Sequence, residues 1–139
     1  MSDFIWRPIA TVALNVPEPQ TAAWTPAIDF IAANRLYRIK AAGTWRLCDA
    51  GTDCGADGME IPPRSSDPVC AGSPFGALIA KIGGGTADKS GTIIAVGRYC
   101  VYQITDATKT GPLYLGVNDK YELMTKVTGQ MQVEIEIAL

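Results

Sequence analysis

The chain of 139 residues contains no histidine, and this absence removes several chemistries at once. A serine or cysteine nucleophile lacks its usual activating base, because histidine most often accepts that proton. A zinc site usually joins a cysteine pair to histidines or to a second pair, and the four cysteines show no such spacing. We therefore expect a protein that is not an enzyme, with cysteines that serve as structural thiols or a disulfide.

Charge of either sign is also scarce. Twelve basic and 14 acidic residues leave a formal net charge of −2. A nucleic-acid partner is disfavoured, because phosphate binding needs a concentrated basic surface. No apolar run approaches the roughly 20 residues that cross a bilayer, so we expect no membrane insertion.

The N-terminus lacks the features of a signal peptide. Asp3 stands where a basic start is expected, and Pro8 interrupts the apolar part of the segment. We expect synthesis in the cytoplasm, and leave open a release from the cell or a place in an extracellular particle such as a virion.

What the sequence does contain is strand periodicity. Met131, Val133, Ile135 and Ile137 alternate with polar residues, the pattern of a strand with one face on a core. Further strands are expected at Val12–Val16, Tyr37–Ala41, Ile93–Val96 and Tyr99–Ile104, with central strands at Phe75–Ile82 and Leu113–Val117. The segment Ala22–Asn34 contains Pro26, so we expect it to be extended or a single turn. Seven or eight strands without helical periodicity predict an all-β sandwich.

Several segments, in this order, resemble the PA-I type bacterial galactophilic lectins and the related galactose-binding-like jelly-roll modules. The matching segments are 37–45, 54–58, 76–83, 96–97, 111–120 and 129–135. The resemblance implies one domain with a jelly-roll β-sandwich over 35–139. It leaves 1–34 as an N-terminal strand or extension, which is a candidate assembly arm.

The resemblance also implies a calcium ion at a loop edge, through which a sugar is bound. Asn118 and Asp119 match the start of the calcium-binding loop, while the family's asparagine pair falls on Lys126 and Val127. A threonine position of the family falls on Leu123, with Thr125 close by. The expected ligand-binding residues are Asn118, Asp119, Glu122, Thr125 and Asp57, with Asp119 and Asn118 as candidate calcium ligands.

A long loop from Asp49 to Pro74 carries two further candidates. Its acidic residues, among them Asp53 and Asp57, could hold a cation, but their spacing does not match an EF-hand loop, so solvated turns are the preferred interpretation. Cys48 and Cys54 enclose five residues and are the pair expected to form a disulfide if the protein leaves the cell.

Two functions from different classes fit these observations. In the first, the protein is a glycan-binding, lectin-like module whose site lies between loops 49–74 and 118–128. In the second, it is a structural or adaptor subunit of a larger assembly such as a phage virion, and the sandwich serves as a scaffold without ligand. Both hypotheses predict a homo-oligomer. They differ in whether the 118–128 loop is open to a glycan or covered by a protein partner.

Overall fold

The computed structural model describes residues 5–16, 23–48, 52–59, 68–88 and 90–139. These residues form eight strands and two short 3-10 helices. The elements are β1 (Trp6–Val16), β2 (Thr25–Ile31), β3 (Leu36–Arg46), β4 (Leu78–Ile82), β5 (Thr92–Ala95), β6 (Tyr99–Gln103), η1 (Ala107–Lys109), β7 (Gly111–Val117), η2 (Tyr121–Lys126) and β8 (Thr128–Ala138).

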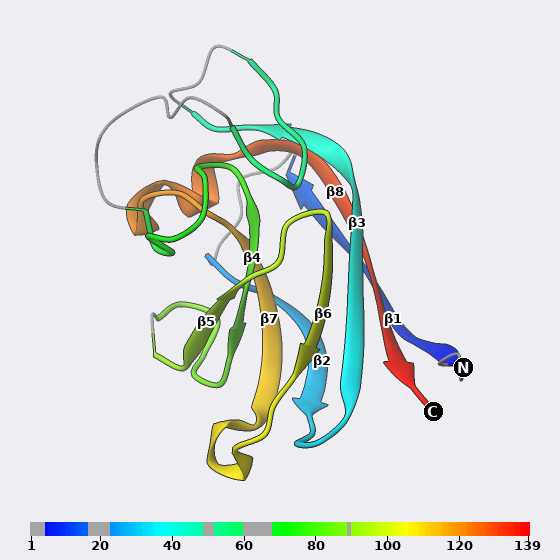
Figure 1. Ribbon diagram of the computed structural model, residues 1–139. Coiled ribbons are helices and arrows are strands. Elements are labelled where there is room, and N and C mark those ends of the chain that lie inside the picture. The colour runs from blue at the N-terminus through cyan, green and yellow to red at the C-terminus, as the bar shows by residue number, and fades with distance from the viewer. Residues whose placement is uncertain (1–4, 17–22, 49–51, 60–67, 89) are drawn as a thin grey trace.

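The strands form two four-stranded antiparallel sheets that face each other (Figure 1). Sheet A has the order β1-β8-β3-β6, and sheet B has the order β2-β7-β4-β5. Two packed sheets of four strands with this order form a jelly roll, so the predicted fold class is confirmed.

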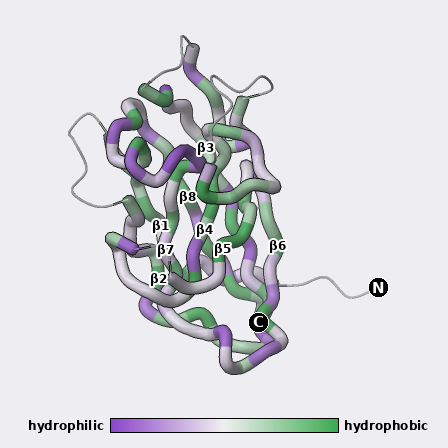
Figure 2. The backbone as a smooth tube through the Cα atoms, turned by 90° about the vertical axis from the view of Figure 1, so that its left-hand side faces the viewer, coloured by the Kyte–Doolittle hydropathy of each residue, from purple (hydrophilic) through white to green (hydrophobic). Residues whose placement is uncertain are grey.

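The core lies between the two sheets, where alternate residues of each strand point inward. Sheet A contributes Ile39, Trp45 and Val133, and sheet B contributes Leu113 and Leu115, all of them buried. Figure 2 shows green, hydrophobic segments in the middle of the molecule, interspersed with white and purple ones, and further purple segments in the connections.

The strand predictions are largely confirmed, with two informative differences. β4 and β7 are the central strands of sheet B, as their continuous apolar runs predicted. However, β4 begins at Leu78 rather than Phe75, because Gly76 adopts a φ of +84° and turns the chain before the strand starts. The N-terminal segment 1–34 supplies β1 to sheet A and β2 to sheet B, so its described strands are part of the sandwich. A role of this segment in assembly stays a prediction.

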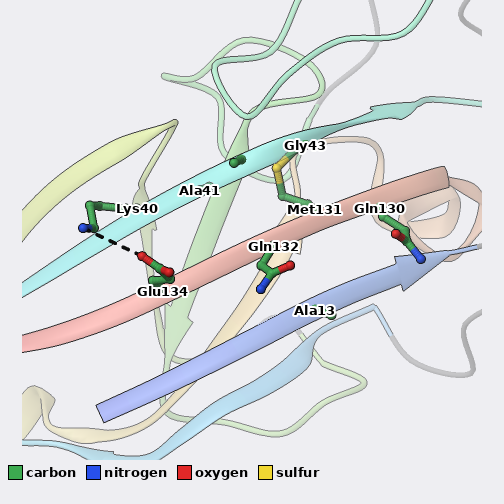
Figure 3. A pocket seen from close by; sticks show the side chains of 9 residues that line it. Ala13, Lys40, Ala41, Gly43, Gln130, Met131, Gln132 and Glu134 are labelled. Atoms are coloured by element: carbon green, nitrogen blue, oxygen red, sulfur yellow. Dashed lines mark ion pairs between the residues drawn. The ribbon is translucent and has the colours of Figure 1, made fainter. Parts of the chain in front are cut away.

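The outer faces of the two sheets differ in how far they are covered. Every residue of β4 is buried, including those that point away from the core. On sheet A, Ala42, Gln130 and Gln132 are exposed, and a shallow hollow lies over β1, β8 and β3 (Figure 3).

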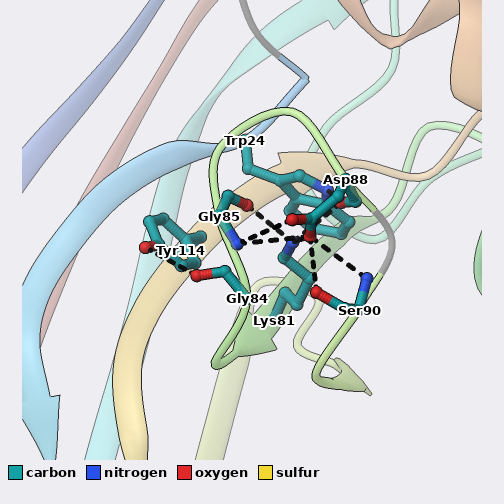
Figure 4. Close-up of polar contacts among 7 residues, drawn as sticks. All are labelled: Trp24, Lys81, Gly84, Gly85, Asp88, Ser90 and Tyr114. Carbon is teal, nitrogen blue, oxygen red and sulfur yellow. Dashed lines mark hydrogen bonds and ion pairs between the residues drawn. The ribbon is translucent and has the colours of Figure 1, made fainter.

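A buried lysine holds the β4–β5 loop over the outer face of sheet B (Figure 4). Lys81 on β4 is fully buried, and its Nζ donates to the Gly85 carbonyl at 2.6 Å. It also donates to the Asp88 carbonyl at 2.7 Å and to Asp88 Oδ1 at 2.8 Å. The ammonium lies 5.2 Å from the Trp24 ring centroid and 5.5 Å from that of Tyr114. The charge is thus neutralised locally, and the β4–β5 loop is held against the outer face of sheet B.

Stability should therefore fall in acid in a way that depends on Asp88. Hydrogen bonds from Lys81 first, then from Ser90 and the Gly85 N–H, hold the pKa of Asp88 well below its usual range. A depressed pKa stabilises the folded state above the unfolded pKa of about 3.9, and this contribution is lost as the pH falls below it. We expect the melting temperature of the wild type to fall more steeply between about pH 5 and pH 2 than that of Asp88→Asn. Parallel slopes in thermal melts would contradict this assignment.

Candidate functional site

The predicted binding residues lie at the sandwich end where β3, β5 and β7 finish. Three connections meet there, namely residues 47–77, 96–98 and 118–127. Arg46 pairs with Thr128 across sheet A, and Leu78 pairs with Val117 across sheet B, so the loops emerge at the same edge. We call this end the loop edge.

Asn118 is fully buried and fixes part of the β3–β4 connection. Its Oδ1 accepts the Cys70 N–H at 2.9 Å, and its Nδ2 donates to the carbonyls of Cys70, Ser73 and Pro74 at 2.9, 2.9 and 3.0 Å. Its own backbone carbonyl accepts the Gly76 N–H at 2.8 Å. One amide side chain therefore contacts four backbone groups and shapes the 70–74 turn. Its two Nδ2 protons are shared among the three carbonyls, and those of Cys70 and Pro74 also accept the backbone N–H groups of Ser73 and Ala77.

Asp119, the next residue, is also fully buried. Its Oδ1 accepts the Lys120 N–H at 2.8 Å, and its carbonyl accepts the Val69 N–H at 3.0 Å. Asp119 thus ties the β7–β8 connection to the segment that precedes Cys70. Burying a charged carboxylate away from water costs free energy unless it is paired, so Asp119 is a candidate functional residue at this edge.

The other predicted residues on this loop lie in η2. Glu122 is exposed and Thr125 is half-buried. The family's asparagine pair is replaced by Lys126, which is exposed, and by Val127, which is buried in the core. Val127 therefore serves packing here and offers no side-chain oxygen to a cation.

Asp57 lies on the β3–β4 connection and bonds to the β5–β6 turn. Its Oδ1 accepts the Arg98 N–H at 2.8 Å, and its Oδ2 lies 3.1 Å from Arg98 Nε. Both side chains are more than half exposed, so the ion pair itself contributes little stability, on the order of 0–1 kcal/mol. Its effect is to position the turn. Asp53 forms a similar exposed pair with Arg46 at 2.8 Å.

Within the described residues, no three His, Cys, Asp or Glu side chains lie close enough together to hold a metal ion. The Asn118 oxygen already accepts the Cys70 N–H, so one lone pair is left for a cation. The predicted calcium site thus reduces mainly to Asp119 together with backbone and hydroxyl oxygens. Calcium binding stays a prediction.

No disulfide joins the four cysteines, all of which lie in the described part of the chain; Cys48 is exposed and Cys54 is half-buried. Burial raises the pKa of the Cys54 thiol, and burial alone raises that of Cys100. Both thiols are therefore held in the protonated, less reactive form. Oxidation of the Cys48–Cys54 pair outside the cell stays a prediction.

Sequence reasoning located Asn118 and Asp119 at a sheet end but missed their partners. Nothing in the local pattern links Asn118 to Cys70, which lies 48 residues away, or Asp57 to Arg98. The acidic residues Asp49, Glu60 and Asp67 of the 49–74 loop lie outside the described residues.

The two sheets define the fold as a jelly-roll β-sandwich. Among solved structures, the chain is similar to the N-terminal domain of EclA, described as a PllA-like lectin, with a TM-score of 0.62 and 18% sequence identity. The similarity covers 94% of this chain and 97% of the other. No family model and no curated protein matches the sequence. At this identity, the likeness establishes the fold alone.

A separate finding concerns membranes: in the part of the chain that the structure describes, no helix is long and apolar enough to span one.

Proposed function

We propose that this protein is a non-enzymatic glycan-binding module whose ligand binds at the loop edge, next to Asp119. The observation that carries the proposal is the pair of fully buried polar side chains, Asn118 and Asp119, that ends β7 and fixes the adjoining loop. These hydrogen bonds already hold the adjoining loop in place, so a hydroxyl-rich ligand that binds there would cost little further conformational entropy. The fold shared with a PllA-like lectin domain supports the same proposal.

The mechanism at this edge is recognition without bond cleavage. The four hydrogen bonds of Asn118 hold the 70–74 turn in place. Asp119 is fully buried, so its carboxylate would accept hydrogen bonds from sugar hydroxyls or coordinate a calcium ion only once the residues that cover it move aside. Asp119, together with backbone and hydroxyl oxygens of the loop, would hold a calcium ion, which would supply a positive centre that attracts sugar hydroxyl oxygens.

The test is a glycan array screened with calcium and again with a chelator. We expect the wild type to bind and Asp119→Asn, which keeps the shape but removes the charge, to bind at least about tenfold more weakly. Asp29→Asn is the matched control, because Asp29 is exposed on β2 near the opposite end of sheet B. Loss with the chelator would assign calcium, whereas equal binding by both variants would remove Asp119 from the site.

A silent array under both conditions would overturn the proposal and favour the structural or adaptor role. Ile5, Ile9 and Leu139 favour that alternative, because they are exposed apolar residues near the paired chain ends. An assembly partner, including a second copy of the chain, would bury them.

A further inference from the structure

We propose that the outer face of sheet A carries a second glycan-binding site, a groove that takes an extended, neutral oligosaccharide. It lies on β1, β8 and β3, away from the loop-edge residues of the proposed function, and does not depend on them. Its six defining residues are Ala13, Lys40, Ala42, Gln130, Gln132 and Glu134, which line a hollow of about 580 Å³. Small-molecule sites typically measure roughly 300–1,000 Å³, so the hollow has a suitable size.

The strand register explains why this face is hollowed. Gln132 of β8 pairs with Ala13 of β1 on one side and with Ala42 of β3 on the other. This row runs across three strands, and the two short alanine side chains on either side of Gln132 form the floor. Glu134 and Lys40, which also pair across the sheet, stand on one side of the row, and Gln130 stands on the other (Figure 3).

Alanine at these exposed positions requires an explanation. It is depleted in strands, where branched or longer side chains cover the sheet better. Ala13 and Ala42 nevertheless flank Gln132 on the solvent side, and both are exposed. The space above them admits a flat ring, which a threonine or lysine at either position would fill.

The lining is chemically matched to sugar hydroxyls. The two glutamine amides each offer donors and acceptors, and the Glu134 carboxylate accepts. Lys40 Nζ lies 3.8 Å from Glu134 Oε2 and 3.2 Å from Glu136 Oε1, so the cationic charge is compensated. With no excess of positive charge, the groove favours a neutral chain over a phosphate or sulfate polymer.

An aromatic platform lies at the β6 side of the groove. Tyr99 pairs in register with Lys40, and 58% of its surface is exposed. A tyrosine ring offers an apolar plane with a polar tip, which suits the apolar face of a sugar ring. An oligosaccharide that crosses the strands from β1 toward β6 would meet amides first and this ring last, so the site fits a chain rather than a monosaccharide.

The experiment is a titration of ¹⁵N-labelled protein with cellotetraose and chitotetraose, followed by amide chemical shifts. We expect shifts in Gln130–Glu134 and Lys40–Gly43, with little change in the 118–127 loop. Ala42→Arg, which fills the floor, should weaken binding at least about tenfold. Gln103→Arg is the matched control, since Gln103 is exposed on β6 of the same sheet but does not line the hollow.

Each outcome decides the proposal. If Ala42→Arg does not fold, Gln132→Ala replaces it, because this variant removes the central amide from an exposed position. Wild-type affinity in the folded variant, or no shifts on sheet A with either tetrasaccharide, would overturn the second site. Shifts confined to 118–127 and abolished by Asp119→Asn would overturn it too, while supporting the loop-edge function.

Discussion

Lys81→Met should be among the most destabilising single substitutions in this protein, lowering the free energy of unfolding by about 2–4 kcal/mol. Methionine fills much of the same volume but donates no hydrogen bond. The Gly85 carbonyl loses the donor at 2.6 Å, and Asp88 Oδ1 loses its ammonium partner. The substitution also removes the cation–π interactions of the ammonium with the Trp24 and Tyr114 rings, which contribute on the order of 0.5–2 kcal/mol.

Urea denaturation followed by tryptophan fluorescence measures this effect directly, because Trp24 lies against the lysine. Lys120→Met is the matched control, since Lys120 is exposed and should change stability by less than about 0.5 kcal/mol. If both variants unfold at the same urea concentration, the buried ammonium does not hold the β4–β5 loop against the sheet.

The sequence predicted where Lys81 lies but not how its charge is neutralised. The apolar run around it predicted a central strand covered on both faces, and β4 is such a strand. A lysine in that run conflicts with burial unless it has partners. Those partners are two backbone carbonyls and one carboxylate within the next seven residues, and only the path of the loop brings them together.

The fold as a whole could be predicted further than the site. Alternation along 131–137 fixes which face of β8 meets the core, because side chains of a strand alternate with a period of 2. Periodicity alone cannot give the strand order, since β1 pairs with β8 from the far end of the chain. The resemblance to jelly-roll lectins, which draws on several segments at once, predicted the type of fold, and the structure supplies the strand order.

The candidate groove on sheet A could not be predicted from the sequence. In the sequence, the polar residues that alternate with the core positions of β8 look like an ordinary solvent-facing row. Nothing there marks Gln130, Gln132 and Glu134 as lining a hollow. The hollow arises only because Ala13 and Ala42 come from two other strands and flank Gln132. Such a feature depends on register between distant segments, which local patterns do not encode.

Asn118→Ala should have an effect at least as large as Lys81→Met, lowering the free energy of unfolding by about 3–5 kcal/mol. The alanine leaves the Cys70 N–H and the carbonyls of Cys70, Ser73 and Pro74 without the side chain that bonds to them. Water entering the gap would recover part of this loss. Because the 70–74 turn shapes the loop edge, glycan binding there should fall with stability.

Asn118→Asp separates the two roles considered for this residue. As a calcium ligand, an aspartate would serve at least as well as asparagine, because calcium prefers charged oxygen ligands. As the residue that holds the 70–74 turn, it would fail, because its second oxygen would face three carbonyl oxygens that now accept from the Nδ2 group. We expect destabilisation comparable to that of Asn118→Ala, measured by urea denaturation with and without calcium. Wild-type stability of Asn118→Asp in calcium alone would instead make Asn118 a metal ligand.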